Sequence, residues 1–147
     1  MICLAQTELD RQRLEGLGVN AAELVSDGRT YSGSVKKPWG SEREIWLTPE
    51  FSMWRLTIEQ GQETSMHCHP SKTTLLIVEK GNVVFGTLGI EFPVHEGKSV
   101  LIERGVFHRT RAPLGAVVVE VEWPPNRCDL VRLEDKYGRK KTGYEGC

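Results

Sequence analysis

The chain has 147 residues and a formal net charge of −1, from 19 lysines and arginines against 20 aspartates and glutamates. This length accommodates one domain with a sizeable core but no second large catalytic domain, and the balanced charge disfavours nucleic acid and anionic membranes as partners. The N-terminus has no long apolar run behind a basic segment, and no stretch approaches the roughly 18 apolar residues of a membrane-spanning helix. We therefore expect a cytoplasmic protein.

Residues 1–29 are expected to form an N-terminal helical extension. The segment "TELDRQRLEGLG" predicts one short helix, with Thr7 as N-cap and with Gly16 and Gly18 ending it. The helix would serve packing or a subunit contact. The cysteines of the chain are scattered and include no CxxC pair, so we expect reduced thiols rather than a zinc knuckle or a disulfide framework at Cys3, Cys68, Cys128 and Cys147.

Residues 30–124 are expected to form a barrel of short strands. Segments rich in Val, Ile, Leu and aromatic residues recur there between glycines and prolines, and they predict strands at 42–47, 52–59, 73–79, 82–88, 99–103, 106–111 and 116–123. In "SMWRLTIE", Trp54, Leu56 and Ile58 alternate with more polar positions, which gives one apolar face. This spacing favours an all-β sandwich or barrel over a βαβ fold. Residues 125–147 are expected to form a charged C-terminal arm.

Two histidines stand one residue apart in "GQETSMHCHPSKTTLLIVEKG". In a strand, His67 and His69 would point to the same side and Cys68 to the other. Such a pair is suited to a metal ion and needs at least one further ligand from elsewhere in the barrel. The expected supplier is His108, which follows a turn at Gly105. His95 precedes Gly97 in a predicted loop and is expected at the surface.

These histidines and glycines resemble the two cupin motifs. The first motif, G(X)5HXH(X)3-4E(X)6G, is matched by Gly61, His67, His69 and Gly81, and the second, G(X)5PXG(X)2H(X)3N, by Gly97, Gly105 and His108. Cupins are small barrels of two antiparallel sheets that hold a metal inside, and they are commonly dimers. The resemblance therefore implies an all-β cupin barrel (double-stranded β-helix, jelly-roll-like), with a short N-terminal helix, a C-terminal arm and a homodimeric assembly.

The chain departs from the motifs at three positions. The family glutamate falls on Thr74, the motif proline on Glu103 and the terminal asparagine on Ala112. The implied ligands of a divalent ion (zinc, manganese, nickel or iron) are then His67, His69 and His108. Three histidines suffice for a catalytic metal, and a weaker site or loss of the metal remains an alternative.

The flanks carry a narrower resemblance. "KPWGSEREIW" and "DLVRLEDKYGR" are similar to segments that bracket the cupin domain of type II phosphomannose isomerases, a domain often fused to a mannose-1-phosphate guanylyltransferase. The resemblance implies a sugar-phosphate isomerase that interconverts aldose and ketose through an enediol. In such a reaction the metal would polarise the carbonyl oxygen and a carboxylate would move the proton.

The candidates for these roles follow from residue type. The proton-transfer candidates are Glu120 and Glu122, which share one face of a predicted strand, and Glu103. Cations that could bind a phosphate are Lys72, Arg109 and Arg111, which lie beside the histidines in the sequence, and Arg139, which the resemblance of the YGR segment implies. Trp39 and Trp46 could wall a sugar pocket. Two other classes stay open: a non-catalytic cupin that binds a sugar or effector, and a three-histidine iron dioxygenase acting on thiols.

Overall fold

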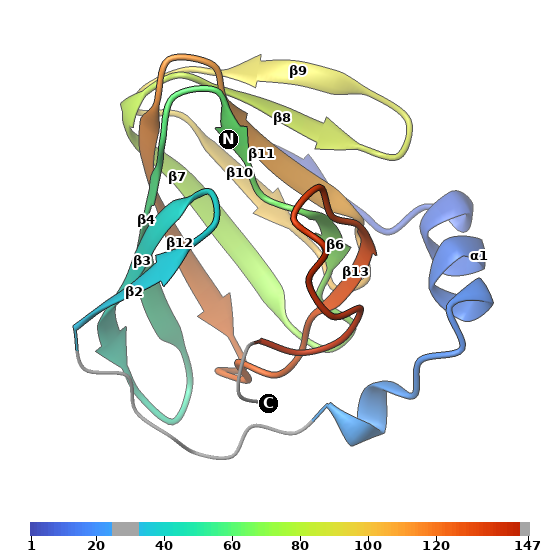
Figure 1. Cartoon of the computed structure of the whole chain (residues 1–147). Coiled ribbons are helices and arrows are strands. Elements are labelled where there is room, and N and C mark those ends of the chain that lie inside the picture. Colours follow the sequence, from blue (N-terminus) through green and yellow to red (C-terminus); the bar gives the residue numbers. More distant parts are fainter. Residues whose placement is uncertain (25–32, 145–147) are drawn as a thin grey trace.

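Two facing β-sheets form a barrel (Figure 1) in the computed structural model, which describes residues 1–24 and 33–144. The seven-stranded sheet has the order β1 (Ile2–Leu4), β10 (Ser99–Ile102), β7 (Thr73–Gly81), β12 (Ala116–Trp123), β4 (Ser52–Ile58), β3 (Gly40–Leu47) and β2 (Ser34–Lys37). The second sheet has the order β13 (Val131–Glu134), β6 (Met66–Cys68), β11 (His108–Ala112), β8 (Val83–Thr87) and β9 (Glu91–Val94), with β5 (Gln62–Glu63) paired to β11. The expectation of an all-β cupin barrel is confirmed.

All seven predicted strands are present, and their burial follows the expected alternation. On β4, Trp54, Leu56 and Ile58 are buried, whereas Arg55 and Thr57 are exposed. The strands that the sequence did not predict are short or polar, such as β9 with its Pro93 and β13 in the charged arm. These strands are held by pairing with longer neighbours rather than by their own apolar pattern.

The predicted N-terminal helix is confirmed as α1 (Glu8–Gly16), followed by the short 3-10 helix η1 (Ala21–Glu23). Thr7 caps α1 in a capping box with Asp10, whose second carboxylate oxygen accepts a hydrogen bond of 2.9 Å from the Phe107 amide. Figure 1 shows α1 on the outside of the barrel, beside β6 and β13. There Leu14 and Leu17 pack on the outer apolar cluster of Met66, Cys68, Phe107 and Val131. The helix therefore packs within its own chain.

The interior between the sheets is apolar over much of its length. Its fully buried members include Ile58, Leu76, Val78, Val83, Phe85, Val100 and Val118. The cysteine expectation is wrong at one position, because Cys128 is disulfide-bonded, whereas Cys3 and Cys68 are free. Cys147 and the expected boundary at residues 29 and 30 lie outside the described residues.

Neither terminal segment is separate from the barrel. β1 pairs in parallel with β10, and β13 pairs with β6, so each end of the chain adds a strand to one sheet. Among the helices of the described ranges, none combines the length and apolar character needed to cross a bilayer.

Candidate metal centre

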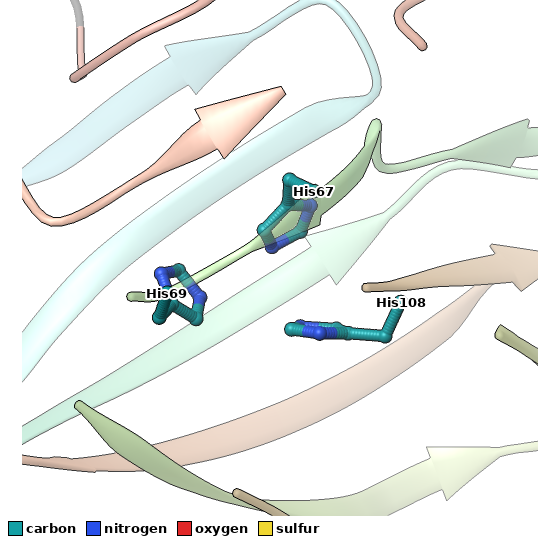
Figure 2. A group of neighbouring side chains, drawn as sticks. All are labelled: His67, His69 and His108. Carbon is teal, nitrogen blue, oxygen red and sulfur yellow. The ribbon is translucent and has the colours of Figure 1, made fainter. Parts of the chain in front are cut away.

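Three buried imidazoles converge inside the barrel. His67 lies on β6, His69 directly follows that strand, and His108 begins β11 as the cross-strand partner of His67. Their ligand atoms all lie within 4.8 Å of one another, and the ring centroids are 4.5 to 5.5 Å apart. Figure 2 shows the three rings gathered around one space. The structure thus brings together the three histidines that the spacing selected.

Backbone carbonyls select the same tautomer at each histidine. The Nδ1 atom lies 2.8 Å from the Ser65 carbonyl oxygen in His67, 2.6 Å from that of Asp129 in His69, and 2.9 Å from that of Val106 in His108. A carbonyl can only accept a hydrogen bond, so Nδ1 carries the proton and Nε2 keeps a free lone pair. The Nε2 atom of His108 is buried without a hydrogen-bond partner among the described residues. Three lone pairs held in this way fit a divalent ion.

Burial keeps these imidazoles uncharged. The pKa of His67 and the pKa of His69 are lowered well below the usual value, first by desolvation and then by neighbouring positive charge. Burial lowers the pKa of His108 to about 4. Neutral imidazole is the form that binds metals, so no proton has to be removed at neutral pH.

A charged wall on the opposite sheet faces the histidines. Glu120 and Glu122 are both buried on the inner face of β12. The Nζ atom of Lys72, itself fully buried, donates a 2.8 Å hydrogen bond to Oε2 of Glu122, and Oε1 of Glu122 lies 4.0 Å from Nε2 of His69. The pKa of Glu120 is raised to about 8 by burial and by repulsion from Glu122. Carboxylates and histidines therefore meet across the barrel interior.

Thr74 occupies the position where the cupin motif has a glutamate. It lies on β7, is 1% exposed, and its Oγ1 atom has no hydrogen-bond partner within residues 1–24 and 33–144. Its cross-strand partner on β12 is Glu122. The position that lacks the motif glutamate therefore lies directly opposite another glutamate, Glu122.

Asp129 supports the site in a way that the sequence did not indicate. Its backbone carbonyl orients His69, while its Oδ2 atom accepts hydrogen bonds of 2.9 and 3.0 Å from the amides of Ser71 and Lys72. These bonds hold the turn between β6 and β7 against the C-terminal segment. The sequence of the charged arm does not predict this role for Asp129. Each of the three hydrogen bonds involves a backbone group, and a backbone group has no sequence signature.

A small cavity of about 20 Å³ opens beside His67. It is lined by His67, Glu120, Trp39, Arg132, Arg139 and Tyr144, the last two from the segment after β13. Arg139 is held there by Asp135, with hydrogen bonds of 2.7 and 3.1 Å to its two carboxylate oxygens. A larger groove of about 660 Å³, around Leu114 and Gly81, contains none of the candidate site residues.

Several candidates are not brought to the histidines. Arg109 and Arg111 alternate with the buried positions of β11 and lie on its outer face, where both pair with Glu91 at 3.4 and 3.3 Å. Glu103 is exposed in the turn before β11. Trp46 is exposed, whereas Trp39 is buried at the cavity. His95 is exposed, as expected.

The comparison with known proteins agrees with this architecture. Residues 54–121 match the family model described as the cupin domain. An RmlC-like cupin from Shewanella frigidimarina superimposes with a TM-score of 0.59 at 16% identity, covering 67% of this chain and 92% of that one. A structure titled sugar phosphate isomerase from a cupin superfamily, from Silicibacter pomeroyi, gives a TM-score of 0.56 at 17% identity over 63% of this chain and 64% of that one. Residues 54–121 therefore carry a cupin domain, and the barrel has the fold of these structures.

Relatives found by sequence give a more specific comparison than the fold does. The xanthan biosynthesis protein XanB of Xanthomonas campestris is 31% identical over 137 residues, covering 88% of this chain and 29% of XanB. A mannose-1-phosphate guanylyltransferase of Klebsiella pneumoniae is 27% identical over 109 residues, covering 71% of this chain and 23% of that protein. The chain is thus homologous to the cupin region of mannose-1-phosphate guanylyltransferases and spans less than a third of the length of these relatives.

Proposed function

We propose that this cupin is a metal-dependent sugar-phosphate isomerase that interconverts an aldose and a ketose through an enediol. The observation that carries the proposal is the convergence of three Nε2 lone pairs on one side of the barrel interior with the carboxyl group of Glu120 across from them. The sugar-related relatives support the substrate class.

In the proposed reaction the histidines and Glu120 have different roles. His67, His69 and His108 hold a divalent ion, which supplies a Lewis acid for the substrate carbonyl. Glu120 moves the proton between the two neighbouring carbons, because its carboxyl group lines the same cavity as His67. The hydrogen bonds from each Nδ1 to a backbone carbonyl fix the imidazoles, so that the ligands do not reorient during the reaction.

We assign the substrate phosphate to Arg139 rather than to the other candidate cations. Its guanidinium lines the cavity, and although its Nε and Nη2 atoms donate to Asp135, the group has further N–H donors that suit a phosphate. Lys72 is bound to Glu122 in the interior, and Arg109 and Arg111 lie on the outer face. Drug-sized ligands occupy pockets of several hundred Å³, whereas this cavity measures about 20 Å³. Entry of a sugar phosphate therefore requires the residues that line the cavity to rearrange.

The same small volume favours a second candidate, a cupin that binds metal and a small effector without catalysis. The absence of a carboxylate at Thr74 favours a third, an iron dioxygenase acting on small thiols. Both share the three histidines with the isomerase. The candidates therefore differ in metal and substrate rather than in fold.

A panel assay separates the three candidates. The protein is stripped of metal, reloaded with zinc, manganese, nickel or ferrous iron, and assayed against hexose and pentose phosphates and, with iron, for oxygen consumption on thiols. The proposal expects isomerisation with a divalent metal, and a loss of about 100-fold or more in Glu120→Gln while Glu103→Gln stays at the wild-type rate. Thiol-dependent oxygen consumption, or no turnover of any sugar phosphate, would contradict it.

We also propose a homodimer. Ile45, Trp46 and Leu47, at the end of β3, are exposed apolar residues, and exposed apolar surface often marks subunit contacts. Light scattering should give about twice the mass of 16.6 kDa per chain, and Trp46→Ser should shift the equilibrium toward the monomer. A wild-type mass of one chain at micromolar concentration would reject the dimer.

A further inference from the structure

We propose that Glu122 completes the metal centre, supplying from β12 the carboxylate that Thr74 no longer supplies from β7. The inference rests on the metal site of the proposed function and is independent of the isomerase reaction. It adds a fourth protein ligand to the three histidines and gives Glu122 a role different from that of Glu120.

The pairing of β7 and β12 makes the exchange possible. Thr74 and Glu122 are direct partners in this antiparallel pair, so their side chains stand on the same inner face. Opposed residues have Cβ atoms about 4.5 to 5.5 Å apart, a displacement that a glutamate side chain can span. Both residues are buried, at 1% and 3% exposure, so each side chain ends in the interior that the histidines occupy. A carboxylate on β12 can therefore reach the space that a carboxylate at position 74 of β7 would reach.

The distances fit a shared ion. Oε1 of Glu122 lies 4.0 Å from Nε2 of His69, while the histidine ligand atoms are as much as 4.8 Å from one another. Two donors bound to one zinc ion at about 2.0 to 2.2 Å in tetrahedral geometry lie roughly 3.4 Å apart. The separation of Glu122 from His69 is therefore about 0.6 Å longer than that of two zinc ligands.

The two oxygens of Glu122 have different surroundings. Oε2 accepts from Nζ of Lys72 at 2.8 Å and from Oγ of Ser52 at 3.5 Å. Oε1 lies on the side of His69, 4.0 Å from its Nε2 atom. One oxygen is therefore anchored, and the other is directed toward the histidines. The anchor also explains a buried lysine at this point, since it balances the charge of the carboxylate and holds its orientation.

The test is zinc affinity, measured by competition with a chromophoric chelator. Glu122→Gln replaces the carboxylate by a neutral amide oxygen, a weaker donor, and keeps the shape, so we expect zinc to bind at least tenfold more weakly than in Glu120→Gln. The second variant is the matched control, because it removes a carboxylate from the same face of the same strand two residues away. An equal loss of zinc affinity in the two variants would show that any negative charge on this face has the same effect, and it would overturn the proposal.

Two further variants extend the test. The first controls for an unpaired buried lysine, and the second places a carboxylate at position 74. Glu122→Gln removes the carboxylate that pairs with Lys72. The comparison is therefore repeated in a Lys72→Met background, where Glu122→Gln is again expected to bind zinc at least tenfold more weakly than Glu120→Gln. Unchanged affinity in that background would again overturn the proposal. Thr74→Glu added to Glu122→Gln should recover most of the lost affinity, together with the visible spectrum of the Co²⁺-loaded protein. A metal-loaded wild type without isomerase activity would reject the proposed function and leave this inference standing.

Discussion

The two ends of β12 face different interiors. Ala116 and Val118 point into an aliphatic half of the barrel and pair with Ile58 and Val78, whereas Glu120 and Glu122 point into the half that contains the histidines. Burying charge costs free energy unless it is paired, and burying apolar surface is favourable. The aliphatic half therefore stabilises the fold, so that the polar half can hold groups selected for chemistry. Substitutions in the two halves should have separable effects.

The largest effect is expected in the polar half. His108→Ala removes one of three imidazole donors, so zinc should bind at least about a thousandfold more weakly, or about 4 kcal/mol. Its circular dichroism spectrum should stay that of the wild type. His95→Ala, at an exposed histidine, is the matched control and should keep the wild-type affinity. Retained zinc binding in His108→Ala would place the metal elsewhere.

A substitution in the aliphatic half is expected to lower stability without changing zinc affinity. Ile58 is 1% exposed and lies opposite Ala116. Ile58→Ala should lower the free energy of unfolding by about 2 to 5 kcal/mol, because it removes buried methylene groups and leaves a cavity. Urea unfolding measures this loss, and the zinc affinity of the folded protein should stay within twofold. A large drop in affinity would show that the two halves are coupled.

Acid should destabilise the metal-free protein through the polar half. The pKa of His108 is lowered to about 4 by burial, so between pH 6.5 and 4 the unfolded chain binds a proton that the folded chain does not. Stability therefore falls as the pH falls, by about 1.4 kcal/mol per pH unit for each such histidine. His108→Gln should flatten the pH dependence of the unfolding free energy by about one proton. An unchanged slope would contradict the buried neutral state.

The smallest effect is expected on the outer face. Arg109 is only partly buried and pairs with Glu91 beside solvent, where ion pairs contribute little. Arg109→Gln should change the free energy of unfolding by less than about 0.5 kcal/mol and leave zinc affinity unchanged. Arg139→Gln, on the inner side at the cavity, is the contrasting variant and should raise KM for a sugar phosphate. An equal rise in KM for both variants would show that the outer face takes part in binding.

The strands were predictable because their apolar residues recur with a period of two. The same period placed Glu120 and Glu122 on one face, but it could not say whether that face was inside, since carboxylates usually face solvent. Period two also separates Arg109 and Arg111 from His108, although all three are near in sequence. Proximity along a strand was therefore a poor guide to the site.

The remaining features of the site depend on contacts between distant segments. Asp129 orients His69 through its backbone carbonyl, a group that every residue has, so no residue type marks the position. The ion pair of Lys72 and Glu122 joins residues 50 positions apart. The partnership of Thr74 and Glu122 follows from strand register, which the sequence does not state. The motif spacing was sufficient for the histidines because it encodes that register within a family of folds.

The most direct test of the metal centre combines elemental analysis with X-ray absorption spectroscopy of the zinc-reconstituted protein. The structure predicts one ion per chain, with the scattering pattern of three imidazoles and with oxygen donors in the remaining positions. Substoichiometric zinc after reconstitution, or a spectrum with fewer than three imidazoles, would contradict the metal centre and with it the proposed chemistry.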